Sequence, residues 1–219
     1  MAYLQTVGFT GKVNTDQTGS FPVTSSRSSK YLMVLYDHDS NAILAEPLTS
    51  HSKHELIQAT CVLHSYLSNR GLTPQYQMLD NECPGGLKQF LRNSSVKFQL
   101  VPPHLHRTNA AKRAIQTYKD HLVAGLRSCN PNFPLHLWYR LIPHATLTLN
   151  LLCPSSMNPR LSAEAQLNGA FNYNCTPLSH SSTRIVVQKI TRQRGDLCRF
   201  GWCVWRRWCN EGAEDRVGT

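Results

Sequence analysis

The pattern of apolar and polar residues over the first 152 residues predicts short strands and helices. A near-continuous apolar run covers residues 31–36 and a second extended segment covers 41–48, with a polar turn at 37–40 between them. This pattern predicts a β-hairpin, in which Asp37 and Asp39 serve the turn rather than a metal. Two further apolar runs, at 76–79 and 96–101, predict two more strands. Asp80 follows the first of them, so a carboxylate is expected at that strand's carboxyl end.

Four other segments have apolar residues at helical spacing. Ser52 can cap a helix over 53–67, with Glu55 as its capping-box partner, and a short helix is expected at 87–91. A long helix is expected over 109–126, and another over 134–152. Their predicted buried residues are Ala111, Ile115, Tyr118, Leu122 and Leu126 in the first, and Trp138, Leu141, Ala145 and Leu149 in the second. Strands that begin as a hairpin and then alternate with helices predict an α/β sheet with helices on its faces.

The pattern weakens beyond Pro154. Residues 158–190 are expected to form a connector with one short β segment at 183–190. The tail, residues 191–219, is rich in Arg, Trp and Cys. It is either a basic, aromatic surface for nucleic acid or a poorly folded, frame-altered end, and the acidic residues that follow without periodicity favour the second interpretation.

Charge is unevenly distributed along the chain. Residues 1–100 carry 8 Lys/Arg against 7 Asp/Glu, whereas residues 101–219 carry 15 against 6, and the whole chain has a net charge of +10. A basic second half suggests a polyanionic partner, most simply nucleic acid. The eight cysteines form no C-x-x-C pair, and no secretory start precedes them, so a reducing intracellular compartment is expected. The most apolar later stretch, 138–152, is interrupted by Arg140, His144 and Asn150, so no membrane span is expected.

Several motifs resemble, in their order and spacing, the integrase catalytic core of copia-type retrotransposons. They are T-D-x-T-G with Asp16, K-Y-L-M-V-L-Y-D at 30–37, L-D-N-E with Asp80, A-A-K-R-x-x-x-T at 110–117, and W-x-x-L-x-x-x-A-x-x-T-x-N at 138–150. The resemblance covers roughly residues 12–180, with a leader at 1–12 and a core-like domain at 13–157. It implies a ribonuclease H-like fold: a mixed five-stranded sheet, its first three strands antiparallel, flanked by helices.

The resemblance also implies a chemistry. Strand transfer by this family uses two divalent cations, Mg²⁺ or Mn²⁺, held by an Asp-Asp-Glu trio. Asp16 and Asp80 fall on the two aspartates, and Lys112 falls where the glutamate is expected. No acidic residue lies between Glu82 and Asp120, and only Glu82 is near enough to lean in. Lys112 is therefore expected to repel a second cation, to pair with Asp16 or Asp80, and to impair catalysis. The plainer alternative is two turn-capping acids and a solvated lysine.

The same resemblance suggests DNA contacts by His104, His106, Arg107, Arg113 and Lys119 near the site. It implies a nuclear, homo-oligomeric protein without a small-molecule substrate. The family's zinc module is not found, so the chain is expected to be a piece of a longer integrase. Two functions compete: an integrase core with impaired strand transfer, and a non-catalytic module that binds nucleic acid or protein. A retroelement relic without a function is the third alternative.

Overall fold

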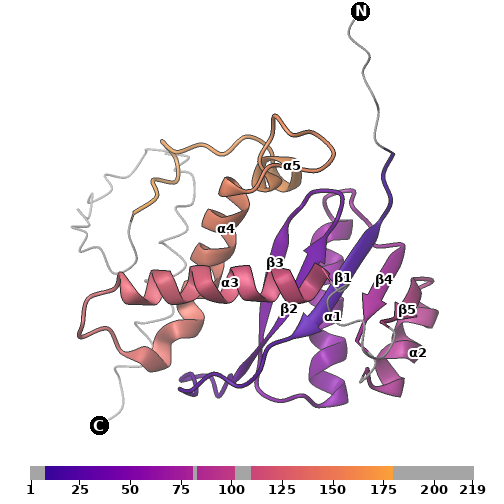
Figure 1. Cartoon of the computed structure of the whole chain (residues 1–219), viewed down its shortest axis with the longest axis horizontal. Coiled ribbons are helices and arrows are strands. Elements are labelled where there is room, and N and C mark those ends of the chain that lie inside the picture. The colour runs from indigo at the N-terminus through magenta and orange to yellow at the C-terminus, as the bar shows by residue number, and fades with distance from the viewer. Residues whose placement is uncertain (1–7, 81–82, 102–109, 180–219) are drawn as a thin grey trace, which may run out of the picture.

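The computed structural model describes residues 8–80, 83–101 and 110–179. These residues form a five-stranded sheet in the order β3-β2-β1-β4-β5 (Figure 1). The strands are β1 (Lys12–Gln17), β2 (Tyr31–Asp37), β3 (Ile43–Leu48), β4 (Tyr76–Leu79) and β5 (Lys97–Leu100). The first three are antiparallel to one another, while β4 runs parallel to both β1 and β5. The expected mixed α/β sheet is confirmed.

Helices cover both faces of this sheet (Figure 1). Helix α1 (Lys53–Ser68) packs on one face, and α3 (Ala110–Arg127) and α4 (Ile142–Leu152) pack on the other, while α2 (Gly85–Asn93) lies beside β5 and α1. Along β2, Met33 and Leu35 join the core under α1, whereas Leu32 and Val34 join the core under α3 and α4. Because both faces are covered, β2 is apolar at all four positions.

Helix α1 begins at the predicted cap. The Ser52 hydroxyl accepts a hydrogen bond from the Glu55 amide, 3.4 Å away. The Glu55 carboxylate does not return the bond to Ser52, as a full capping box would; it accepts from the Thr49 amide at 3.0 Å. The first turn of α1 is thereby tied to the end of β3, which sets where the helix enters the sheet.

The single helix predicted over 134–152 is wrong in its first half. The structure has a 3₁₀ helix, η2 (Leu135–Leu141), followed by α4. Pro143 lies in the first turn of α4, and because it has no N–H it cannot continue an α-helical ladder from the preceding turn. Trp138, Leu141, Ala145 and Leu149 are buried as predicted.

A short helix, α5 (Ala163–Asn168), lies within the stretch expected to be a connector. The Ser162 hydroxyl caps it by accepting from the Ala165 amide at 3.1 Å. Its six residues are too few to show a helical period in the sequence. Ala163 and Leu167 of α5 extend the core under α1.

The side chain of Asn150 on α4 pairs with the backbone of β3, which is an edge strand. Its Oδ1 accepts from the Ile43 amide at 2.9 Å, and its Nδ2 donates to the Ile43 carbonyl at 3.0 Å. Asn150 is fully buried. One amide group thus satisfies the outward-facing donor and acceptor of Ile43, as a neighbouring strand would.

The β2–β3 turn uses its two aspartates differently. Asp37 accepts from the Ser40 amide at 2.8 Å and from the Ser40 hydroxyl, which confirms its predicted role in the turn. Asp39 accepts from the amides of Thr10 and Gly11 instead, at 3.1 and 2.7 Å. Its carboxylate therefore fastens the segment that leads into β1.

The predicted β segment at 183–190 and the tail at 191–219 lie outside the described residues. Within residues 8–80, 83–101 and 110–179, no helix is long and apolar enough to cross a membrane.

Candidate active site

Asp16 and Asp80 meet at the carboxyl ends of two adjacent parallel strands. Strands β1 and β4 pair in a register that puts Asn14 beside Met78. The same register, extended by two residues, puts Asp16 beside Asp80. Because side chains alternate between the faces of a sheet, both aspartates lie on the face of Asn14 and Met78, which contact each other at 3.7 Å. The sheet thus brings two carboxylates together that are distant in sequence.

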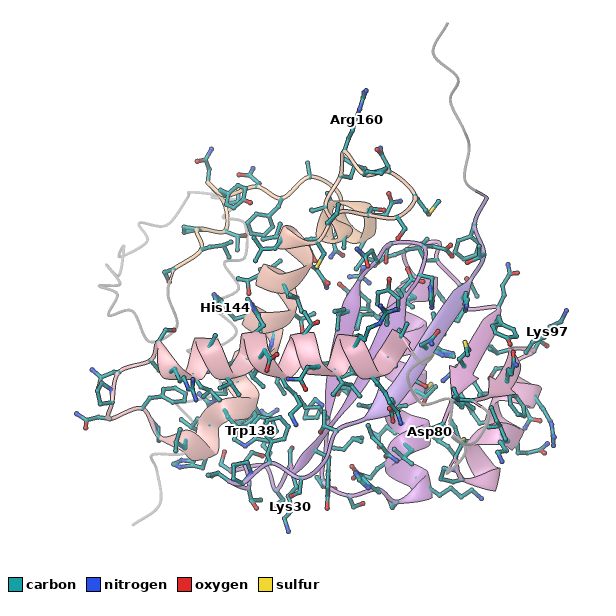
Figure 2. All side chains as sticks on the ribbon, viewed as in Figure 1. Lys30, Asp80, Lys97, Trp138, His144 and Arg160 are labelled. Atoms are coloured by element: carbon teal, nitrogen blue, oxygen red, sulfur yellow. The ribbon has the colours of Figure 1, made fainter. Side chains whose placement is uncertain are left out.

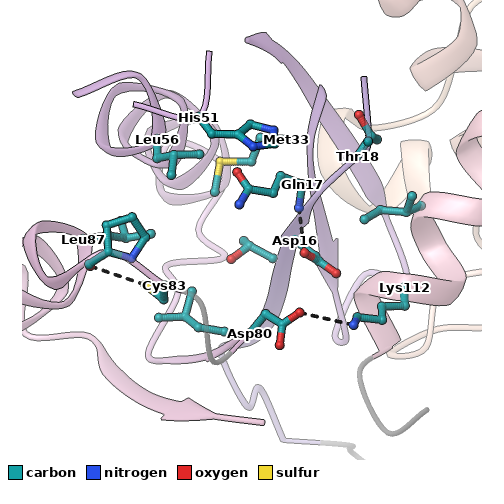
Figure 3. Close-up of a pocket in the computed structure, with 15 residues that line it drawn as sticks. Asp16, Gln17, Thr18, Met33, His51, Leu56, Asp80, Cys83, Leu87 and Lys112 are labelled. Carbon is teal, nitrogen blue, oxygen red and sulfur yellow. Dashed lines mark hydrogen bonds and ion pairs between the residues drawn. The ribbon is translucent and has the colours of Figure 1, made fainter. Parts of the chain in front are cut away.

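Lys112 reaches these carboxylates from the first turn of α3, which packs against β1 and β2. Its ammonium nitrogen lies 3.2 Å from Oδ2 of Asp80 (Figure 3). The two side chains keep 37% and 27% of their surface exposed, so the pair is partly solvated. Asp16 accepts a hydrogen bond from the Gln17 amide at 2.8 Å. The expected pairing of Lys112 with one of the two aspartates is confirmed.

The three charged groups line one side of a cavity of about 440 Å³. Figure 3 shows Lys112 and Asp80 on one side of this cavity and Met33, Leu56 and His51 on the other. Its lining also includes Gln17, Thr18, Leu79, Cys83, Leu87 and Ile115. The cavity therefore has a charged end, where β1, β4 and α3 meet, and a more apolar end between α1 and α2. A crevice at the carboxyl ends of parallel strands is where ligands bind in open α/β sheets.

The residues described at this site do not fit a pair of divalent cations. The described lining of the cavity supplies two carboxylates, and beside them lies the Lys112 ammonium, which carries the same sign of charge as a cation would. Asp120, further along α3, holds the side-chain amide of Gln116 at 2.8 Å and does not line the cavity. Glu82 lies outside the described residues. No cluster of three or more His, Cys, Asp or Glu suited to a metal occurs in the part of the chain that the structure describes.

Sequence reasoning did not find the wall of the cavity opposite Lys112. His51 precedes the cap of α1, and its ring lies 3.9 Å from that of Tyr31, centroid to centroid. Cys83 precedes α2, and burial raises the pKa of its thiol, with Lys88 opposing, so it stays protonated at neutral pH. Both residues precede helices that begin at the same end of the sheet as Asp80, where β4 ends. In the sequence, this position just before a helix is the signal that could have pointed to His51 and Cys83.

A buried polar layer lies behind the site, on the α1 face of the sheet. The Gln77 side-chain amide donates to the Thr15 hydroxyl at 2.6 Å, which joins β4 to β1 one residue before Asp16. His64 of α1 is buried beside them. Burial lowers the pKa of His64 to about 4, against a smaller opposing effect of the Gln77 side chain. The imidazole is therefore neutral at physiological pH.

Of the five residues expected to contact DNA, the structure describes two. Arg113 is exposed on the first turn of α3, and Lys119 is half-buried two helical turns beyond Lys112 on the same face. His104, His106 and Arg107 lie outside the described residues. The structure thus places Arg113 and Lys119 on the helix that carries Lys112.

No protein-family model matches the chain, and no curated protein matches it. Solved structures do. The magnesium complex of the HTLV-2 integrase catalytic core, in its dimeric form, is 21% identical, with a TM-score of 0.51 over 73% of this chain and 95% of that one. A chain of the simian T-cell lymphotropic virus intasome is 16% identical, with a TM-score of 0.56 over 82% of this chain and 60% of that one.

The catalytic core of BIV integrase is 12% identical, with a TM-score of 0.51 over 72% of this chain and 93% of that one. At such identities the likeness shows the fold. The chain has the ribonuclease H-like fold of the retroviral integrase catalytic cores.

Proposed function

We propose that this chain descends from the integrase catalytic core of a copia-type retrotransposon, binds DNA, and is impaired in strand transfer by Lys112. The ion pair between Lys112 and Asp80 carries the proposal. Strand transfer in this fold family needs three carboxylates around two cations. An ammonium in place of the third carboxylate changes the charge of the site by two units.

The residues of the site support this proposal directly. The Lys112 ammonium occupies an oxygen of Asp80 that a cation would need, and it adds a positive charge close to where that cation would lie. Like charges a few ångströms apart repel by several kcal/mol, about 4 kcal/mol for unit charges 4 Å apart at an effective dielectric constant of 20. The cofactor of a variant with restored strand transfer would be Mg²⁺ or Mn²⁺, whereas the unaltered chain would use none.

The solved structures add support for partners. The HTLV-2 core has been solved in dimeric and trimeric forms, which supports self-association of this chain. The net charge of +10 supports a nucleic-acid partner. We place its action inside the cell, in the nucleus, because chromosomal DNA is found there. The proposal includes neither a membrane nor a small-molecule substrate.

The test is a strand-transfer and end-processing assay in Mg²⁺ and in Mn²⁺. It compares the unaltered chain with Lys112→Glu and with Lys97→Glu, a matched charge change on the exposed edge of β5 (Figure 2). We expect activity from Lys112→Glu alone. Activity in the unaltered chain would contradict the proposal and would mean that another group, such as Glu82, completes the site.

If none of the three proteins showed strand-transfer activity although each was folded and bound to DNA, the role given to Lys112 would be contradicted. It would favour the second function, a non-catalytic binding module. The ion pair gives that alternative its own support, because Lys112 neutralises the charge of Asp80 without a cation.

A further inference from the structure

A long connection between β1 and β2, residues 18–30, folds against η2. The ring of Phe21 stacks on Trp138 with centroids 4.5 Å apart and planes 13° from parallel. The Trp138 indole N–H donates to the Val23 carbonyl at 2.8 Å, and the Ser26 amide donates to the His136 carbonyl at 2.8 Å. We call this connection, together with η2, the ridge. Figure 2 shows Lys30 and Trp138 on it.

The tip of the connection is a closed turn that presents Arg27. The Ser25 amide donates to the Ser29 carbonyl at 2.9 Å, and the Ser29 amide donates back to the Ser25 hydroxyl at 2.9 Å. Ser28 has a φ of 62°, in the left-handed region, which lets the chain reverse there. Arg27 is exposed on this turn. Its backbone is thus already ordered, which lowers the entropy cost of binding.

Two guanidinium groups of the ridge share one tyrosine. The carbon Cζ of Arg27 lies 5.1 Å from the ring centroid of Tyr139, and that of Arg140 lies 5.9 Å from it. Nε of Arg140 also donates to the Tyr139 hydroxyl at 3.2 Å. The phenol is buried and holds one cation over its face and the other at its oxygen.

The pKa of Tyr139 reports the potential at this point. Burial raises it, but hydrogen bonds from Arg140 and Ser26 and the charges of Arg140 and Arg27 outweigh burial, so the pKa lies below its ordinary value. A negative charge is therefore favoured beside these two arginines.

The segments that build the ridge contain no acidic residue. None occurs from residue 17 to 36, which holds Arg27 and Lys30, nor from residue 121 to 163, which holds Arg127, Arg140 and Arg160. The connection also begins at the cavity, because Thr18 and Gly19 line it. The basic surface is thus continuous in sequence with the rim of the candidate site.

We propose that the ridge binds the phosphate backbone of duplex DNA through Arg27 and Arg140, as a contact separate from the Asp16–Asp80 cavity. This rests on the proposed DNA binding. Guanidinium groups match phosphate oxygens in geometry as well as charge. Trp138 and Tyr139 are buried and one face of the Phe21 ring is covered by Trp138, so among the described residues the ridge offers unpaired bases little ring surface beyond the exposed His136. That argues for a duplex, contacted without regard to sequence.

The test measures binding of the full chain to a duplex oligonucleotide by fluorescence anisotropy across a salt series. The variant is Arg27→Ala with Arg140→Ala. Its matched control is Arg92→Ala with Lys97→Ala, which removes the same charge from exposed positions on α2 and β5. Removing one arginine that binds a phosphate should lower the slope of log Kd against log salt by about 1, so a fall of about 2 is expected in the variant alone. Replacing both arginines by lysine should keep most of the slope.

Failure of the ridge is distinguishable from failure of DNA binding itself. If the unaltered chain bound DNA in a salt-dependent way and the double alanine variant had an equal slope, the proposal that the ridge binds DNA would be overturned. The proposed function would still stand. No salt-dependent binding by the unaltered chain would overturn both. If removing the hydrogen bond from Arg140 to Tyr139 unfolds the double variant, Arg27→Ala alone, at the exposed tip, should still lower the slope by about 1. An unchanged slope there would overturn the ridge.

Discussion

Replacing Asn150 by alanine should destabilise the protein more than any surface substitution, because it leaves two buried backbone groups without hydrogen-bond partners. Asn150 is fully buried and Ile43 is 5% exposed. The substitution removes the hydrogen bonds of 2.9 and 3.0 Å between them and leaves the Ile43 N–H and carbonyl without partners. A buried polar group without a partner costs about 1–3 kcal/mol. For the two groups together, the free energy of unfolding should therefore fall by about 2–6 kcal/mol.

Urea unfolding followed by circular dichroism measures this change. With an m-value of about 2 kcal/mol per molar urea, the midpoint should fall by about 1–3 M. Asn93→Ala is the matched control: Asn93 is exposed, and its side-chain oxygen accepts from the exposed Gln89 amide at 3.1 Å. Its removal should cost less than about 1 kcal/mol.

Asn150→Asp separates the two hydrogen bonds. It keeps an acceptor for the Ile43 amide but sets a second oxygen against the Ile43 carbonyl, so it should destabilise at least as much as alanine does. If Asn150→Ala unfolded at the same urea concentration as the unaltered protein, the pairing of α4 with the edge of β3 would contribute nothing and the reasoning would be refuted.

Two further predictions concern buried residues. The unfolded chain protonates His64 near pH 6.5 and the folded chain only near 4, so stability should fall as pH drops from 6.5 towards 4, by about 3 kcal/mol in all. His64→Gln should flatten that part of the pH–stability profile measured by urea unfolding, and an unchanged profile would contradict it. Tyr118→Phe removes a hydroxyl that donates to the Ile142 carbonyl at 3.1 Å and lies 3.0 Å from the Thr146 hydroxyl. It should lower the free energy of unfolding by about 1–2 kcal/mol, whereas Tyr173→Phe on the exposed surface should leave it unchanged.

Local pattern was enough to predict most elements of the fold. The apolar run of β2 and the helical spacing in α3 reflect burial that each segment shows by itself. The order of motifs brought Asp16, Asp80 and Lys112 into one hypothesis, and the structure places them around one cavity.

What the sequence did not predict depends on contacts between distant segments. Asp39 fastens Thr10, 29 residues earlier, and Trp138 binds the Val23 carbonyl, 115 residues away. No local pattern distinguishes such an aspartate from one that only serves its turn. The break between η2 and α4 had a visible signal, Pro143, but the buried residues on both sides share one helical spacing and concealed it.

The parallel pairing of β1 with β4 has a consequence for how the site assembles during synthesis. Strands β1, β2 and β3 pair with neighbours in sequence, whereas β4 must insert beside β1 after α1 has been made. Such non-local pairing forms late, because the chain must first close a long loop. Because synthesis follows the sequence, Asp16 leaves the ribosome first, Asp80 later and Lys112 last. A nascent chain that has not yet made α3 would hold two adjacent carboxylates without their counter-ion, so the charge balance of the site is completed only when α3 packs on the sheet.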